Sequence, residues 1–348
     1  MLASSLNDSN VETESTLDEL LTRPGPALVE FIKTIRTPLL LLGAGGKMGP
    51  TLAVMAQRAA QQASHRLEIL AASRFSDETA RRWLDDHDVR TICCDLMDSD
   101  NLRQLPDAEH IIYLVGLKFG TTQNPASTWA INTLVPANVC ARYPRSKIAA
   151  LSSGSIYPLV PIHSGGAAES EPLTPLGEYA NACVARERIF EYFSHQNHTP
   201  IALLRLFYAV EMRYGVLVDI AQKVYAGEPI DLTMGHLNWI WQGDATERIL
   251  RSLALVSTPP TPFNLTGSKT YSVRELALQF GKLLERRVRF TGAEAGTALL
   301  GDTRRLRGHL GEPSMPDEVV IRWIAHWVHR QGRLLGKPTH FEVRDGRY

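Results

Sequence analysis

Leu39-Leu40-Leu41-Leu42-Gly43-Ala44-Gly45-Gly46-Lys47-Met48-Gly49-Pro50 is the most informative part of this sequence. Four consecutive leucines are typical of a strand that is buried on both faces of a sheet. Among the glycines that follow, Gly43 permits a tight turn, Gly46 lets the backbone approach a pyrophosphate, and Gly49 lets a helix pack closely on the strand. The Ala-rich segment 51–62 then has helical character. A strand, a glycine turn and a helix in this order predict a loop that binds a dinucleotide.

The start of the predicted helix suits phosphate groups. Pro50 falls in the first helical turn, where a missing N–H costs little. The free N–H groups and the positive end of the helix dipole then face the ligand, and we expect Lys47 and Met48 to lie against it. A glycine trio alone is a weak motif, and its alternative is a tight strand-to-helix turn without a ligand.

The amino-acid composition limits the classes of function that are expected for this chain. The 348 residues contain 37 Lys+Arg and 37 Asp+Glu, so no general attraction to nucleic acid or to an anionic membrane surface is expected. No apolar run approaches the ~20 residues of a membrane span, and the polar N-terminus does not resemble a secretory signal. The four cysteines show no metal-ligand spacing. We therefore expect a reduced, cytoplasmic protein that binds a small molecule and has no metal site.

Strands and helices alternate along the first two thirds of the chain. This alternation predicts an α/β fold, with a Rossmann-type, doubly wound parallel sheet and helices on both faces. We divide the chain into an N-terminal extension (1–36), a dinucleotide-binding domain (37–207, its sheet possibly completed by later segments) and a smaller substrate lobe with a C-terminal tail (208–348). The predicted strands are 39–42, 67–72, 91–94, 111–115, 147–151 and 200–206, and the predicted helices are 51–62, 77–86, 126–142 and 179–193.

The end of the second predicted strand bears on the choice of cofactor. An acidic residue there would bind the ribose hydroxyls of NAD and repel the 2′-phosphate of NADP. This chain carries Ser73 and Arg74 instead. The pair favours NADP over NAD, unless Arg74 is only an exposed loop residue.

The order of these motifs resembles the extended short-chain dehydrogenase/reductase superfamily, especially its NAD-dependent epimerase/dehydratase group. The resemblance runs from Pro38 to Val328. It implies NAD(P) as cofactor, and a homodimer formed through two helices. The residues that it implies at the cofactor are Gly43, Gly46 and Gly49 in the glycine loop, Asp95 and Leu96 at the adenine ring, Gly116 and Lys118 along the cofactor, Asn132 in the site wall and Phe207 beside the nicotinamide.

The resemblance also implies catalytic residues, and here the chain departs from the family. Ser153 aligns with the catalytic hydroxyl and Tyr179 with the catalytic tyrosine, but Cys183 stands where the family has a lysine. At an effective dielectric of 20, a unit charge 4 Å away is worth about 4 kcal/mol, so a thiol cannot activate the tyrosine as lysine does. Either the chemistry is lost or another cation replaces the lysine. Lys118 is our candidate, whereas we expect Arg186 nearer the outer side of the helix.

Three further residues are candidates for contact with the substrate: Tyr208, Arg213 and His236. Arg213 suits a carboxylate or phosphate, or else an ion pair with Glu211 or Asp219. His236 has a structural role as its alternative. The family's Asn and Tyr-Gly-Pro-like turn are missing after Phe207, which weakens the case for a nucleotide-diphosphate sugar.

Two later segments are assigned to the substrate lobe and the C-terminal tail. Residues 263–265 resemble part of the substrate lobe, and the tail 336–343 is expected to form an edge strand or to cover the cleft.

Two functions fit these residues. The first is an NAD(P)-dependent epimerase, dehydratase or reductase that transfers a hydride on a sugar, sugar-nucleotide or sugar-acid-like substrate. The second is a non-catalytic NAD(P)-binding sensor or scaffold, which the missing lysine would suit. Because a sensor has no evident need for both Ser153 and Tyr179, the sequence favours the enzyme.

Overall fold

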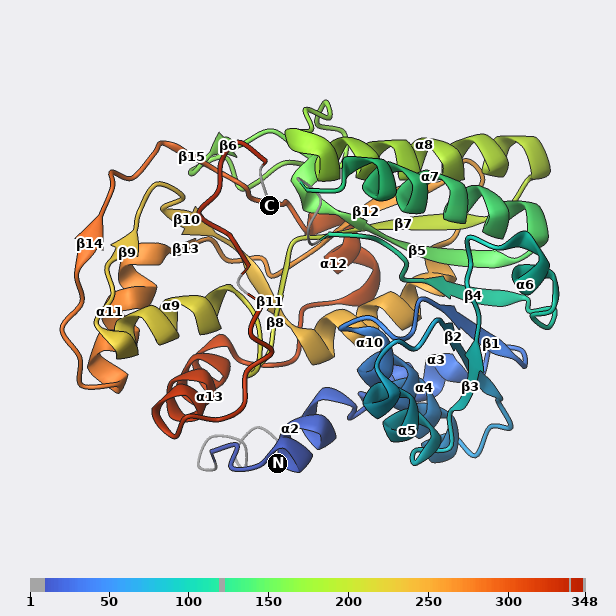
Figure 1. Ribbon diagram of the computed structural model, residues 1–348, viewed down its shortest axis with the longest axis horizontal. Helices are drawn as coiled ribbons and strands as arrows, with labels where there is room; N and C mark the ends of the chain where they lie inside the picture. Colours follow the sequence, from blue (N-terminus) through green and yellow to red (C-terminus); the bar gives the residue numbers. More distant parts are fainter. Residues whose placement is uncertain (1–9, 119–122, 338, 347–348) are drawn as a thin grey trace.

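A parallel sheet of seven strands lies at the centre of the computed structural model, which describes residues 10–118, 123–337 and 339–346 (Figure 1). Its strand order is β12-β7-β5-β4-β1-β2-β3, and all neighbouring pairs are parallel. The predicted α/β class with a doubly wound parallel sheet is confirmed. The strands are β1 (Leu39–Leu42), β2 (Ile69–Ser73), β3 (Arg90–Cys93), β4 (His110–Tyr113), β5 (Lys147–Ser153), β7 (Ile201–Leu206) and β12 (Thr261–Leu265).

The leucine run forms β1, between β2 and β4. All four leucines are fully buried because helices cover both faces of the sheet. Leu39 and Leu41 pack towards one layer, and Leu40 and Leu42 towards the other. The first layer contains α3 (Pro26–Ile32), α4 (Gly49–Gln62), α5 (Glu78–Asp85) and α10 (Gln242–Arg251), and the second contains α6 (Ser99–Arg103), α7 (Pro125–Arg142) and α8 (Gly177–Asn197), as Figure 1 shows.

A late segment completes the sheet. Strand β12 pairs with β7 through its whole length, from Thr261 opposite Ala202 to Leu265 opposite Leu206. The expectation that residues 263–265 belong to the substrate lobe is therefore wrong. The physical reason is burial, since Phe263 and Leu265 pack into the core beneath the sheet.

A smaller group of elements has its own core. Helices α9 (Val216–Ala226), α11 (Val273–Leu283) and α13 (Asp317–His329) pack together around Trp323 and Phe280, on the left of Figure 1. The remaining elements are β6 (Val160–Pro161), β8 (Tyr208–Val210), β9 (Ile230–Asp231), β10 (His236–Leu237), β11 (Trp239–Trp241), β13 (Tyr271–Ser272), β14 (Phe290–Thr291), β15 (Thr297–Ala298), α12 (Arg304–Leu310) and the short turns η1 (Gly154–Ile156) and η2 (Ser252–Leu255).

The two ends of the chain both pack on this smaller group. Helix α2 (Glu14–Leu21) buries Leu17 and Leu21 in its core, while residues 1–9 of the predicted extension lie outside the described part. The tail buries Phe341 in the same core. No helix in the described part of the chain is long and apolar enough to cross a membrane.

Candidate functional site

The glycine loop joins β1 to α4 in the way its residues require. Gly43 has φ +87°, a backbone conformation that favours glycine. A Cβ on Gly49 would lie 2.2 Å from the carbonyl oxygen of Ala44, so only glycine allows this close approach. Helix α4 starts at Gly49 with Pro50 in its first turn, where the missing N–H of proline costs little.

A cavity of about 230 Å³ lies on one side of the loop. It is bounded by the ends of β2 and β3, and Ser73, Arg74, Asp95 and Leu96 all line it. The Asp95 carboxylate accepts a hydrogen bond from the Met97 backbone N–H, which fixes the turn after β3. The four residues that the sequence predicts at the adenine end of the cofactor therefore share one cavity.

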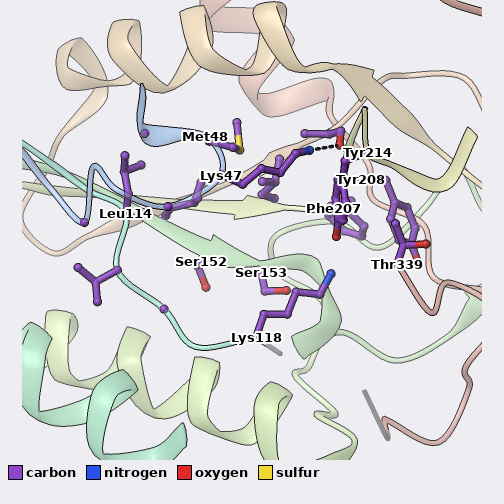
Figure 2. A pocket seen from close by; sticks show the side chains of 18 of the residues that line it. Lys47, Met48, Leu114, Lys118, Ser152, Ser153, Phe207, Tyr208, Tyr214 and Thr339 are labelled. Carbon is purple, nitrogen blue, oxygen red and sulfur yellow. Dashed lines mark hydrogen bonds between the residues drawn. The ribbon is translucent and has the colours of Figure 1, made fainter. Parts of the chain in front are cut away.

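A second cavity, of about 240 Å³, lies on the other side of the loop (Figure 2). The two cavities share Gly43, Gly46, Val115 and Gly116, so together they form one cleft. The cleft runs along the carboxyl ends of β1 and β4, where the strand order reverses and ligands bind in such sheets. The predicted residues that line the second cavity are Gly43, Gly46, Lys47, Met48, Gly49, Gly116, Lys118, Ser153, Tyr179, Phe207 and Tyr208.

This cleft fits a dinucleotide. The glycine loop leaves room for a pyrophosphate, because a Cβ on Gly46 would lie no closer than 3.4 Å to its neighbours. By contrast, a Cβ on Gly116 would meet the Arg186 guanidinium at 2.6 Å, so the floor of the cleft is tightly packed there. A cavity on each side of a phosphate-binding turn matches a ligand with two ring systems joined by a pyrophosphate.

Ser153 and Tyr179 meet inside the second cavity. Ser153 ends β5, and its Oγ lies 2.7 Å from the Oγ of Ser155. Its side chain also shares a hydrogen bond with Tyr179, in the first turn of α8. Burial raises the pKa of Tyr179 well above its usual value, and the neighbouring Cys183 raises it further, whereas Arg186 and Ser153 lower it. The tyrosine is therefore a neutral phenol at physiological pH in this arrangement.

Cys183 lies one turn further along α8 and is fully buried. Its Sγ accepts a hydrogen bond from Arg186 Nη2 at 3.4 Å, and its side chain is also hydrogen-bonded to Tyr179. Burial raises the pKa of the Cys183 thiol, although the Arg186 charge opposes the shift. Cys183 does not line either cavity but lies directly behind Tyr179.

Arg186 faces the cleft, so its expected place on the outer side of the helix is wrong. It is 3% exposed and lines the second cavity, and its Nη1 donates to the Val115 carbonyl (3.1 Å) and to Asn132 Oδ1 (2.9 Å). The sequence carried a signal for this, because Arg186 follows Tyr179 by seven residues, about two helical turns. Residues with that spacing lie on the same helix face.

Lys118 enters the cavity from the wall opposite Lys47 (Figure 2). Burial lowers the pKa of the Lys118 ammonium, while Cys183 and Asp219 raise it. The cavity therefore contains the charges of Lys47, Lys118 and Arg186.

Three predicted residues lie elsewhere. Asn132 is buried behind the cleft, where it binds Arg186 and the Thr128 carbonyl. Arg213 does not line the cavity, because its guanidinium is held by carboxylates of Glu211, Glu14 and Asp18. The alternative prediction, an ion pair of Arg213 with Glu211 or Asp219, is therefore correct for Glu211.

His236 lies in β10, paired with Ser272 of β13, and lines neither cavity.

The second cavity also has lining residues that were not predicted, and two of them are polar residues from late in the chain. Tyr214 follows β8 and faces Lys47, and Thr339 comes from the C-terminal tail (Figure 2). The Thr339 N–H and Oγ1 both donate to Asp219 Oδ2, at 2.8 and 2.6 Å. The tail thus covers the cleft, and none of its described residues forms a strand. No local sequence pattern indicates that a residue so near the end of the chain lies at this site.

The geometry agrees with comparisons to known proteins. A model of the NAD dependent epimerase/dehydratase family matches residues 39–256, more than half of the chain. The chain belongs to this family. A comparison with curated protein sequences found no significant match.

Solved structures of similar fold include sugar-nucleotide enzymes. A dTDP-glucose 4,6-dehydratase from Streptomyces venezuelae, with NAD and TYD bound, is 15% identical with a TM-score of 0.71, over 84% of this chain and 97% of that one. The UDP-glucuronic acid 4-epimerase from Bacillus cereus in complex with NAD is 14% identical with a TM-score of 0.70, over 85% and 99%. The UDP-glucose 4-epimerase from Thermotoga maritima with UDP-glucose is 14% identical with a TM-score of 0.67, over 85% and 99%. At these identities the likeness establishes the fold.

Proposed function

We propose that this member of the family is an enzyme that transfers a hydride at a carbinol carbon of a sugar, sugar-nucleotide or sugar-acid-like substrate. The observation that supports it is the hydrogen-bonded pair of Ser153 and Tyr179, in a cavity that adjoins the dinucleotide cradle. The nicotinamide ring of a bound cofactor supplies the hydride acceptor. The cofactor is held by the glycine loop, by Gly116 and Phe207 in the second cavity and by Asp95 and Leu96 in the first.

In this proposal Tyr179 moves the proton and Ser153 orients the substrate. The phenolic oxygen of Tyr179 accepts the proton of the substrate hydroxyl, while the Ser153 hydroxyl holds the same oxygen in place. Proton acceptance requires a tyrosinate, and burial opposes it by raising the pKa of Tyr179. A nearby cation must offset that effect.

Lys118 is our candidate for this cation, although the charge of Arg186 also lowers the pKa of Tyr179. Arg186 is fixed by Val115, Asn132 and Cys183, whereas the Lys118 side chain reaches the cavity directly. A lysine at position 183 would face the Arg186 guanidinium at close range, so the family's lysine and this arginine are poorly compatible. We propose that Cys183 is a positioning residue. Its thiol is hydrogen-bonded to both Arg186 and Tyr179, so it links the Arg186 guanidinium to the Tyr179 hydroxyl.

The test is hydride exchange by the full-length protein with NAD or NADP across a panel of nucleotide sugars and sugar acids. We expect Tyr179→Phe to lower the rate by about 10²- to 10⁴-fold while cofactor affinity is kept. Exchange that survives in Tyr179→Phe would rule out its role as base. Tight cofactor binding with no exchange on any substrate would instead support the sensor or scaffold, which the absence of lysine at 183 favours.

The cation is tested by pH–rate profiles. Loss of a cation raises the pKa of Tyr179, so Lys118→Met should move the rising limb to higher pH and lower the rate at neutral pH. Cys183→Lys combined with Arg186→Met should move the limb to lower pH, and Cys183→Lys alone serves as the comparison. An unchanged profile in Lys118→Met would exclude Lys118 as the activating group.

The cofactor itself is a separate question. The family is described as NAD dependent and two of the similar structures hold NAD. We nevertheless propose a preference for NADP from Ser73 and Arg74, because Arg74 is exposed at the rim of the adenine-side cavity. Arg74→Ala should raise the dissociation constant of NADP relative to that of NAD, so that the ratio of the two increases. An unchanged ratio would contradict the preference.

A homodimer through α7 and α8 is also proposed. These helices lie side by side (Figure 1), and Trp129, Leu134 and Tyr192 on them are exposed. Analytical ultracentrifugation should show a dimer that Leu134→Glu converts to monomer. A monomeric wild-type protein would contradict it.

A further inference from the structure

Lys47 extends from the glycine loop away from the adenine end of the cleft. It lines the second cavity and is not among the residues that line the first, although Gly43, Gly45 and Gly46 of the same loop are. Its Nζ lies 3.9 Å from the centre of the Tyr214 ring and 3.5 Å from the Ala209 carbonyl oxygen (Figure 2). The ammonium is therefore directed at the wall formed by β8 and the turn before α9.

The ammonium has few ligands there. An ammonium carries three donors, and the described contacts of Lys47 are one long hydrogen bond and one aromatic ring. The two nearby carboxylates have other partners, since Glu211 binds Arg213 and Asp219 binds Thr339.

The cavity around Lys47 has an excess of positive charge. Among its described lining residues are Lys47, Lys118 and Arg186, and none is an aspartate or glutamate. Lysine and arginine side chains gathered without a carboxylate in a cleft raise the local concentration of anions.

We propose that Lys47 forms a subsite for an anionic group, a carboxylate or a phosphate, carried by the reacting sugar of the substrate. The Tyr214 ring and the Ala209 carbonyl orient the ammonium for this contact. The proposal rests on the proposed function, and it makes Lys47 a residue that determines specificity for acidic over neutral sugars.

The alternative ligand of Lys47 is the pyrophosphate of the cofactor. The positive end of the α4 dipole is suited to that pyrophosphate, and it does not require the lysine side chain. Lys47 points past this turn to the β8 wall, where the cofactor-binding residues of the first cavity do not reach. The two ligands are separated by experiment, because only one of them varies with the sugar.

The subsite should depend on pH. Although the Lys47 side chain reaches water in the cavity, the protein around it removes much of its hydration and lowers its pKa to about 7. Of the charged groups that face it, Lys118 and Arg213 also lower the pKa, and Glu211 and Asp219 raise it. Binding of an acidic sugar should therefore weaken as the pH rises through 7, when the ammonium loses its proton.

The experiment is calorimetric titration of the full-length protein, saturated with NAD or NADP, at pH 6 and pH 8. UDP-glucuronic acid is the carboxylate probe, and UDP-glucose, whose sugar is neutral, is its matched partner. Glucose 6-phosphate is the phosphate probe, and glucose is its neutral partner. Lys47→Met keeps the length of the side chain without its charge. Lys147→Met, at the start of β5 beside Glu109, is the matched control on a surface lysine.

At pH 6 we expect the wild type to bind an acidic probe at least about tenfold more tightly than the matching probe with a neutral sugar. At pH 8 this difference in affinity should be smaller. Lys47→Met should abolish this preference, with cofactor affinity within about twofold of the wild type, and Lys147→Met should retain it. The acidic probe that is preferred tells carboxylate from phosphate. Equal binding of all probes by the wild type, or an equal loss of cofactor affinity in Lys47→Met, would overturn the proposal. Because the titration measures binding and not turnover, its result can be interpreted even if the protein has no catalytic activity.

Discussion

The Arg205 guanidinium is buried beneath the cleft and is fully engaged. Its Nη2 lies 2.7 Å from Glu187 Oε2, its Nε donates to Glu187 Oε1, and its Nη1 donates to the Tyr157 hydroxyl at 2.5 Å. Ser152 donates to the same carboxylate, so β5, β7 and α8 are joined by one polar network. Removing one partner of a buried ion pair leaves the other charge without compensation.

We therefore expect Arg205→Met to lower the free energy of unfolding by about 3–5 kcal/mol. The measurement is equilibrium unfolding in urea, followed by circular dichroism. Arg90→Met removes an exposed ion pair with Glu68 and should cost no more than about 1 kcal/mol. Equal effects of the two substitutions would show that burial does not govern the Arg205 pair.

His110 makes stability depend on pH at the start of β4. It is 3% exposed, and its Nδ1 accepts a hydrogen bond from the Arg36 backbone N–H. Burial lowers the pKa of His110 below its ordinary 6.5. The charges of Lys147 and Arg36 act in the same direction, and Glu109 and the Arg36 backbone contact act in the opposite one. The unfolded chain then binds more protons than the folded one below pH 6.5.

The direction in which stability changes with pH follows from this lowered pKa. The contribution of His110 to stability is fully present above pH 6.5 and is lost as the pH falls through the folded-state pKa. His110→Gln should flatten the dependence of the unfolding free energy on pH in that window. A slope equal to that of the wild type would assign the acid sensitivity to other groups.

The residues of the candidate site were predictable where the family motif fixes them on a strand end. Ser153 ends β5 and Lys118 follows β4, and both line the cavity with Tyr179. The position of Arg186 was predicted wrongly because it was inferred from Cys183, one helical turn away, and not from Tyr179, two turns away. The direction of Lys47 depends on the Tyr214 ring, which lies far from it in the sequence.

At the scale of elements, local patterns predicted the sheet strands up to β7 and the helices α4, α5, α7 and α8, but they missed α6 and did not single out β12 as the later segment that completes the sheet. Its hydrophobic pattern suits any buried strand, and only pairing with β7 gives it a place in the sheet. The C-terminal tail poses the same difficulty. Its residues are polar, and its path over the cleft is set by contacts such as those of Thr339 with Asp219 and Arg344 with Thr297.

We expect the Thr339 hydroxyl to hold this tail in place. Thr339→Val keeps the shape and the backbone donor but leaves the partly buried Asp219 with one hydrogen bond fewer, at a cost of about 1–3 kcal/mol to the local structure. Limited proteolysis should cut the tail of this variant faster than that of the wild type, while global unfolding changes little. Thr339→Ser, which keeps the hydroxyl, should restore resistance. A tail equally resistant in all three proteins would contradict this role.

At the scale of the whole molecule, α2 connects the two parts that form the cleft. Glu19 pairs with Arg58 of α4 at 2.6 Å, and Asp18 pairs with Arg213 beside the cavity wall at 3.0 Å. Glu14 pairs with Arg333, just before the tail. The pairs of Glu14 and Glu19 are partly exposed and contribute little each, whereas the Asp18–Arg213 pair is mostly buried. We expect most of the strength of the connection to come from the buried face of the helix.

That face carries Leu17 and Leu21, both fully buried in the core of the smaller part. Leu21→Ala should lower the free energy of unfolding by about 2–5 kcal/mol, because it removes transfer energy and leaves a cavity. Glu19→Gln, which loses only an exposed ion pair, should lower it by no more than about 1 kcal/mol. Urea unfolding of the two variants at low and high salt gives the comparison, and salt should weaken only the ionic contribution. If Glu19→Gln were the more damaging change, the N-terminal helix would be held by its charges and not by its leucines.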